Sequence, residues 1–195
     1  MRLYPVDDTG RDPSFRSYVR RLASAVEAHD VKQLQKLTDR EVLVGPEAED
    51  KGWDKFAARW RPEAEDSELW AVLSDLLSLG FVRQSPGLYL SPYLVWRFPR
   101  ELARETHAVV IRDEVPLRQS PSLKAPVVEI LSFDIVRPLG PPVSGEDLNQ
   151  WIPVQALDGK TGYLTAHDVM SPLMAHAQFA RRDGHWMMTA LEAAR

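Results

Sequence analysis

The chain has 195 residues, a net charge of -4 and no cysteine. Hydrophobic residues make up 44% and charged residues 27%, proportions that are ordinary for a globular protein. The missing cysteine excludes disulfides, zinc sites built on thiolates and cysteine nucleophiles. Basic side chains adjoin only in the dipeptides Arg20-Arg21 and Arg181-Arg182, which suit solvated faces. We therefore expect no nucleic-acid partner, since such binding needs a basic surface.

No apolar run reaches the ~20 residues that a membrane helix needs, so we expect no transmembrane segment. The opening MRLYPVDDTG lacks the apolar core of a signal peptide. These features predict a cytoplasmic protein if Met1 is the true start, or one whose leader has been removed.

The first part of the chain, residues 1–105, is predicted to be a helical domain. Asp12-Pro13 is typical of a helix start, with aspartate as the cap and proline at the first helical position. Apolar side chains at helical spacing predict three further helices. A brief strand is predicted between the first and the second of these. In order, the predicted segments are helix 13–26, helix 31–37, strand 41–45, helix 53–60 and helix 69–77.

The composition changes after Gly80, since 4 of the 15 prolines lie in residues 1–80 and the other 11 follow. Short apolar segments around Pro86-Gly87 predict a hairpin. Residues 91–99 follow as an aromatic linker, which we expect to be extended. Its side chains Tyr93 and Trp96 either fill a domain interface or line a cleft.

Residues 106–170 contain short strands separated by turn signals, a pattern that predicts a small barrel. Residues 171–195 predict a closing hairpin that returns to the N-terminal part, because its apolar face needs a partner. The expected fold class is α+β: a helical segment, a small β-barrel and a C-terminal β-hairpin.

The barrel segment, about residues 108–170, resembles a bacterial SH3 domain. The matching stretches are Val115-Pro116-Leu117-Arg118 with Pro121-Ser122, then Trp151-Ile152-Pro153-Val154, then Asp158-Gly159 with Gly162-Tyr163-Leu164. Proline replaces the usual asparagine at position 116, tyrosine replaces the commoner tryptophan at 163, and residues 140–149 are an insertion. The flanking parts resemble the nuclear-transport-factor-like fold more loosely.

The resemblance implies a non-catalytic binding module for a peptide or a cell-wall fragment, and it favours a location in the cell envelope. Aromatic rings beside a guanidinium suit a peptide that carries apolar and carboxylate groups. The predicted ligand-binding residues are Tyr93, Trp96, Arg118, Trp151 and Tyr163.

Two other functions stay open: an enzyme of unfamiliar type with a site at the aromatic linker, and a scaffold that binds another protein. We predict no catalytic residues and no cofactor, because serine-hydrolase, P-loop and dinucleotide motifs are missing. We also predict no metal. His176 and His185 could face each other across the last hairpin, but a third ligand is not in view.

Overall fold

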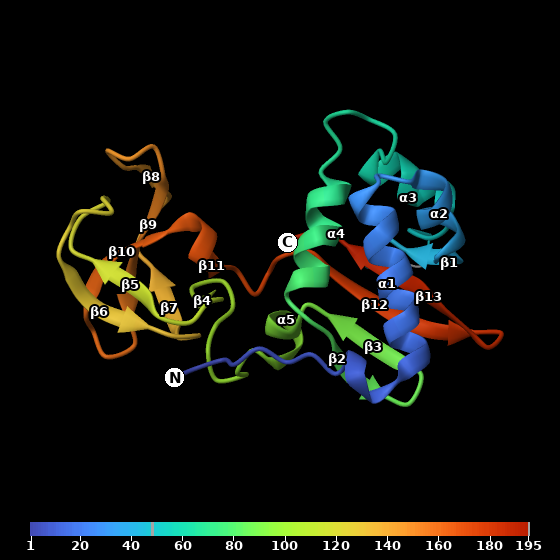
Figure 1. Cartoon of the computed structure of the whole chain (residues 1–195), viewed down its shortest axis with the longest axis horizontal. Coiled ribbons are helices and arrows are strands. Elements are labelled where there is room, and N and C mark those ends of the chain that lie inside the picture. The colour runs from blue at the N-terminus through green and yellow to red at the C-terminus, as the bar shows by residue number, and fades with distance from the viewer. Residues whose placement is uncertain (48, 195) are drawn as a thin grey trace. The chain divides into compact units, whose positions relative to one another are not determined.

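The structure is a computed structural model that describes residues 1–47 and 49–194. It divides into two compact units, each built from two segments of the chain. The helical unit comprises Val6–Trp96 and Met174–Arg195, and the strand unit comprises Met1–Pro5 and Arg97–Leu173. Helices and sheets together confirm the α+β class (Figure 1). Among the described residues, no helix has the length and apolar character to cross a membrane.

Two helices of the helical unit begin at aspartate side chains that cap them. Asp12 accepts the backbone N–H groups of Ser14 and Phe15 at the start of α1 (Pro13–Glu27), as predicted. Asp30 caps α2 (Val31–Lys36) in the same way. The other elements in residues 1–80 are η1 (Thr9–Arg11), β1 (Thr38–Leu43), α3 (Trp53–Trp60) and α4 (Leu69–Ser78).

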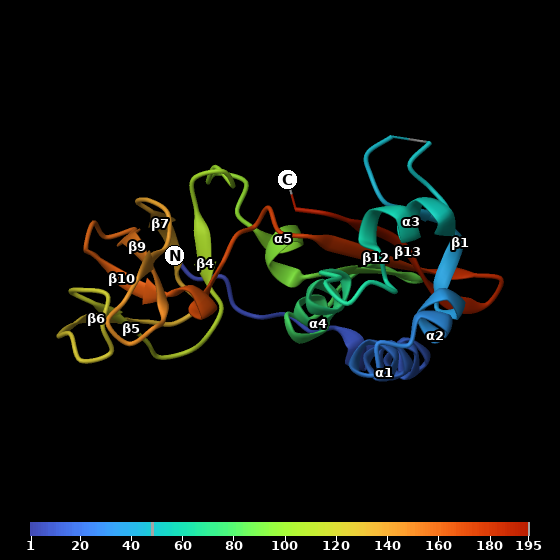
Figure 2. The same cartoon turned by 90° about the horizontal axis from the view of Figure 1, so that it is seen from above.

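A five-stranded sheet carries these helices, with strand order β1-β13-β12-β3-β2. Its other strands are β2 (Val82–Ser85), β3 (Leu88–Ser91), β12 (His176–Arg182) and β13 (His185–Glu192). The C-terminal hairpin β12–β13 thus occupies the middle of the sheet, where β12 pairs with β3 and β13 pairs in parallel with β1. Helices α1 and α4 lie on one face of this sheet (Figure 2).

The core between the sheet and the helices is filled by aromatic rings. Phe15 is fully buried and stacks on Tyr89, with ring centroids 3.8 Å apart. Phe179 and Trp186, from the C-terminal hairpin, contact the same phenylalanine ring edge-on. The interior of this unit is therefore packed with side chains.

The aromatic linker differs from its predicted extended form. Residues Tyr93–Arg97 form a short helix, α5, in which Tyr93, Leu94 and Val95 are buried. Pro92 immediately precedes this helix, a place where proline is well tolerated because no helical N–H is needed there. Proline and aromatic content alone do not distinguish this geometry from an extended one.

The strand unit forms an eight-stranded sheet, and the predicted closed barrel is wrong. The order is β11-β4-β7-β9-β10-β5-β6, with β8 paired to β9, so β6 and β11 are the two ends. Closure depends on whether the first and last strands meet, which strand and turn patterns do not encode. The bounds are β4 (Ala108–Val110), β5 (Val115–Arg118), β6 (Val127–Leu131), β7 (Ile135–Pro138), β8 (Val143–Ser144), β9 (Gln150–Ala156), β10 (Thr161–Thr165), η2 (Ala166–Asp168) and β11 (Val169–Met170).

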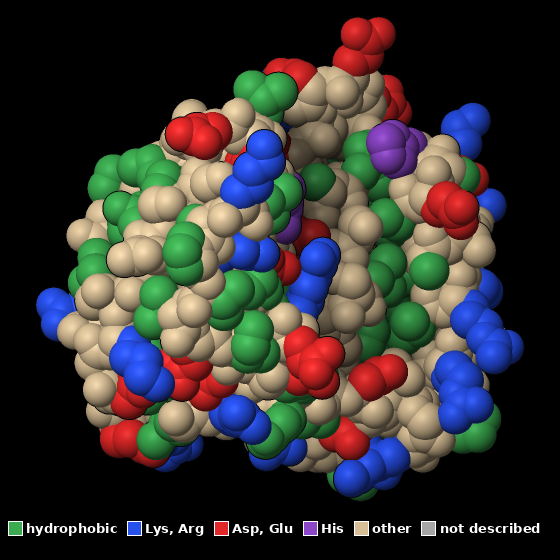
Figure 3. Space-filling view, turned by 60° about the vertical axis from the view of Figure 1, so that its left-hand side comes forward, with side chains coloured by type: hydrophobic (Ala, Val, Ile, Leu, Met, Phe, Trp, Pro, Cys, Tyr) green, Lys and Arg blue, Asp and Glu red, His purple; other side chains and the backbone are tan. Residues whose placement is uncertain are grey.

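Residues 140–149, the insertion relative to the bacterial SH3 pattern, are tied to the sheet. They include β8, and Asp147 accepts hydrogen bonds from the Leu123 N–H and the Trp151 indole. Exposed hydrophobic side chains lie among charged ones on the surface of this unit. Figure 3 shows such a mixture on the face that is turned to the viewer. The exposed hydrophobic side chains include Leu123, Val127, Val128 and Ile130.

Candidate functional site

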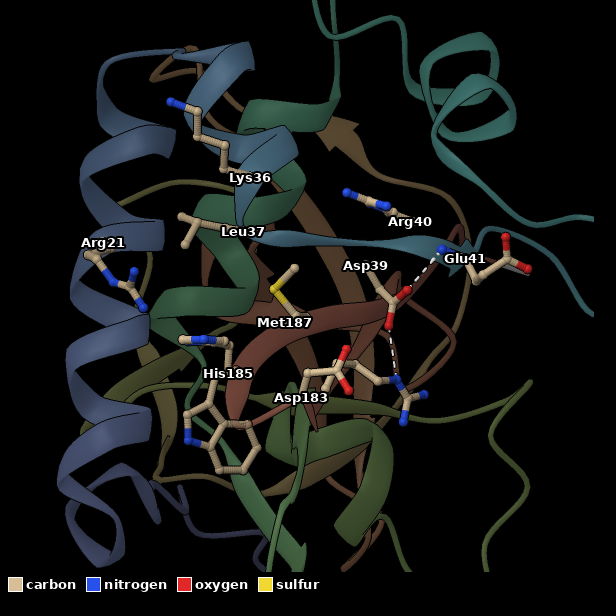
Figure 4. Close-up of a pocket in the computed structure, with 11 residues that line it drawn as sticks. Arg21, Lys36, Leu37, Asp39, Arg40, Glu41, Asp183, His185 and Met187 are labelled. Carbon is tan, nitrogen blue, oxygen red and sulfur yellow. Dashed lines mark hydrogen bonds and ion pairs between the residues drawn. The ribbon is translucent and has the colours of Figure 1, made fainter.

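A cavity of about 820 Å³ opens in the helical unit beside the start of β1 (Figure 4). Its size is within the range of small-molecule sites. The lining comes from α1, the end of α2, β1 and the β12–β13 hairpin. The residues are Arg21, Lys36, Leu37, Asp39, Arg40, Glu41, Arg182, Asp183, His185, Trp186 and Met187.

Hydrogen bonds to one carbonyl hold the edge of the cavity. The Leu37 carbonyl accepts the Tyr18 hydroxyl at 2.9 Å and the Met188 N–H at 3.0 Å. Complete burial of Tyr18 raises the pKa of its phenol, so the hydroxyl keeps its proton and continues to donate. This arrangement ties α1, the end of α2 and β13 together.

The Trp186 side chain is held by a polar network behind the cavity. Its indole Nε1 donates to Ser14 Oγ at 2.9 Å, and Arg181 donates to the same oxygen at 2.7 Å. Ser14 Oγ in turn donates to Asp12 Oδ1 at 2.6 Å. The bond from Ser14, followed by bonds from backbone N–H groups, holds the pKa of Asp12 below its ordinary value despite some desolvation.

Two of the three carboxylates that line the cavity already have cationic partners. Asp39 accepts Arg182 Nε at 2.9 Å and also the Glu41 N–H at 2.8 Å. Glu41 forms an ion pair with Lys51 at 2.7 Å, and its carboxylate points away from the other labelled side chains in Figure 4. These pairs neutralise Asp39 and Glu41.

Three cations of the cavity have no such partner. Arg21, Lys36 and Arg40 form no ion pair with any residue that the structure describes, and Asp183 is the one lining carboxylate in the same condition. Figure 4 shows Arg21 and His185 on one side of Met187 and Asp39 and Asp183 on the other. The cavity therefore combines an excess of positive charge with the apolar side chains of Leu37, Trp186 and Met187.

The chemistry of this lining suits binding more than bond breaking. The set contains one histidine and no serine, threonine or cysteine, so a hydroxyl or thiol nucleophile beside a base is missing from it. Guanidinium and ammonium groups pair with carboxylates, sulfonates and phosphates.

The structure divides the five sequence-predicted ligand residues between the two units. In the helical unit, Tyr93 is 1% exposed, and burial raises its pKa to about 12. Trp96 lies edge-on to His176, with ring centroids 5.4 Å apart. The strand unit holds Arg118, Trp151 and Tyr163.

Within the strand unit, Arg118 and Tyr163 are paired across β5 and β10. Arg118 donates to the Ala125 carbonyl at 2.8 Å. Trp151 is fully buried. A ligand-binding role for these residues stays a prediction.

The two histidines considered as a metal pair lie at opposite ends of the last hairpin. His176 is opposite Glu192, whereas His185 is opposite Arg182. Over residues 1–47 and 49–194, no group of three or more His, Asp or Glu side chains could hold a metal ion.

Sequence reasoning missed the cavity, although part of its signal was visible. The dipeptides Arg20-Arg21 and Arg181-Arg182 were assigned to solvated faces, yet Arg21 and Arg182 line one site. Arg182 also bonds Asp39 from 143 residues away in the chain. Only the fold brings these groups together.

No protein-family model and no curated protein sequence matches the chain. Two solved structures are similar to it at 9% identity each. One, a variant of Rd1NTF2_05, has a TM-score of 0.31 and matches 91% of this chain and 93% of its own. The other, an NTF2-like protein of unknown function from Pseudomonas putida KT2440, has a TM-score of 0.33. The match covers 97% of this chain and 89% of that protein.

The predicted bacterial SH3 domain is therefore wrong, and the cell-envelope location that it favoured stays a prediction without that support. No family model matches the chain, residues 108–170 included, and the sheet of the strand unit is open. Of the short motifs that suggested the family, Asp158-Gly159 serves as an ordinary turn between strands. The stretches 115–118, 151–154 and 162–164 lie within β5, β9 and β10.

Proposed function

We propose that the chain is a non-catalytic binding protein whose helical unit holds an organic anion with an apolar body. The observation that carries this proposal is that Arg21, Lys36 and Arg40, around a cavity of about 820 Å³, form no ion pair with any described residue. Positive groups that lack a partner within the protein are free to pair with a ligand.

The ligand needs an apolar part as well as a charge. Met187 is half-buried and offers hydrocarbon surface next to the cations, whereas Leu37 and Trp186 line the cavity but are almost fully buried. Removing apolar surface from water contributes about 25 cal/mol per Å². Because the site is open and its cations are exposed, we expect a dissociation constant on the order of micromolar to millimolar.

A pair of dyes tests this proposal on the full chain. 8-Anilinonaphthalene-1-sulfonate carries a sulfonate on two aromatic groups, and N-phenyl-1-naphthylamine has the same rings without the charge. We expect fluorescence titration to show tighter binding of the sulfonate. The double substitution Arg21→Gln, Arg40→Gln should weaken its binding by about tenfold, as expected for lost charge-assisted hydrogen bonds.

Arg20→Gln is the matched control, because Arg20 is an exposed neighbour on the same helix that does not line the cavity. Circular dichroism verifies that each variant is folded. Equal affinity for the two dyes, or a double variant that binds the sulfonate as the native chain does, would refute the proposal.

A further inference from the structure

Strand β13 extends beyond its neighbour β1, and the cavity lies beside the part of β13 that β1 does not pair with. The parallel pairing of β1 with β13 begins at Thr38 and Met188, whereas β12 pairs with β13 from His185 onward. In the part of the chain that the structure describes, residues 185–187 of β13 thus have a strand on one side only. Trp186 and Met187 from this stretch line the cavity.

The direction of the backbone groups at this edge follows from the register. The Met188 N–H donates to the Leu37 carbonyl, on the side away from β12. Backbone groups along a strand alternate in direction with a period of two residues. The N–H and C=O of Trp186 therefore point to the same side as those of Met188, where β1 does not reach.

A second bond supports this assignment. Arg181 lies opposite Trp186 in the β12–β13 pair, and its N–H donates to the Gly87 carbonyl at 3.2 Å, away from β13. Arg181 and Trp186 are thus a pair that exchanges no backbone hydrogen bonds. One donor and one acceptor of Trp186 face the open edge.

We propose that this edge binds a short apolar peptide with a free C-terminal carboxylate, as an added strand in line with β1. The peptide backbone exchanges two hydrogen bonds with Trp186, and its carboxylate lies among Arg21, Lys36 and Arg40. Its apolar side chains pack on Met187, which is half-buried. This inference rests on the proposed function and names the ligand class of the same cavity.

The geometry favours a peptide over other organic anions because the site offers a backbone donor and a backbone acceptor as well as positive charge. An extended peptide presents an N–H and a C=O on the same side of each residue, which matches the donor and acceptor of Trp186. A dye or a fatty acid satisfies the cations and the apolar surface but leaves these two backbone groups unpaired. Complementary charge then selects peptides that end in a carboxylate near the cations.

The experiment uses the full chain and N-acetyl-Val-Leu-Val with a free carboxylate. Three analogues each carry an N-methyl group on one residue, and a fourth ends in a neutral amide. Because strand pairing uses alternate N–H groups, we expect N-methylation to weaken binding about tenfold at alternate residues and little at the others. The amide should also bind about tenfold more weakly, and Arg21→Gln but not Arg20→Gln should lose this preference.

Amide hydrogen exchange measured by NMR gives an independent readout. A saturating concentration of the peptide should slow exchange of the Trp186 N–H by at least about tenfold. Unchanged exchange at Trp186, or equal binding of all N-methyl analogues, would overturn strand addition while binding of the sulfonate dye still supports the proposed function. Equal binding of the acid and the amide would overturn the role of the carboxylate. If neither peptide nor dye binds, both proposals are wrong.

Discussion

Removal of the Phe15 ring is expected to destabilise the helical unit severely. This side chain is fully buried, and its ring centroid lies 3.8 Å from that of Tyr89, 4.8 Å from Trp186 and 5.4 Å from Phe81. Replacing a buried phenylalanine with alanine costs about 3–5 kcal/mol, because apolar contacts are lost and a cavity remains. Aromatic pairs add about 0.5–1.5 kcal/mol each to what burial contributes. We therefore expect Phe15→Ala to fall in the upper part of that range.

Urea denaturation followed by far-ultraviolet circular dichroism measures this loss. Helices α1 to α4 all belong to the helical unit, so the helical signal reports on its unfolding. Arg20→Ala, at an exposed position of the same helix, should change stability by less than about 0.5 kcal/mol. If Phe15→Ala does not fold, Phe15→Leu should show a smaller loss in the same direction. A loss below about 1 kcal/mol for the alanine variant would show that this ring is not the centre of the core.

Three further predictions concern one hydrogen bond, one close approach and one helix cap. Tyr18→Phe removes one of the two donors to the Leu37 carbonyl, and urea denaturation should show a loss of about 1 kcal/mol; unchanged stability would contradict the role given to this bond. Gly162→Ala places a Cβ 2.6 Å from a backbone oxygen of the neighbouring strand, so thermal unfolding should show a loss of stability of about 1–3 kcal/mol. The control Gly140→Ala, whose Cβ would have its nearest atom at 3.8 Å, should leave stability nearly unchanged. Asp12→Ala removes the α1 cap and should cost about 1 kcal/mol at neutral pH. Because the pKa of Asp12 is depressed in the folded state, the carboxylate contributes to stability above its unfolded pKa of about 4, and this contribution is lost as the pH falls through the folded pKa. If the stability of the native chain changed no more than that of the variant between pH 6 and 3, this reasoning would be contradicted.

Local signals predicted most of the secondary structure because they act between near neighbours. Asp12-Pro13 and Asp30 cap helices as expected, and the segment from Trp53 to Trp60 is a helix with the predicted bounds. The prediction of an extended aromatic linker was wrong because the burial of Tyr93, Leu94 and Val95 in α5 depends on distant residues. The strand unit shows the same limit, since its strands are largely where the turn signals place them but the sheet stays open.

The sequence by itself determined the α+β class, the start of α1 at its aspartate cap and the alternation of short strands and turns. These depend on propensity and periodicity, which are properties of a few consecutive residues. Tertiary structure alone decided that Arg21, Arg40 and Arg182 line one cavity and that β13 extends beyond β1. The physical reason is that pairing register and charge neutralisation are set by partners far apart in the chain, such as Asp39 and Arg182, and no local pattern specifies which distant side chain will meet which.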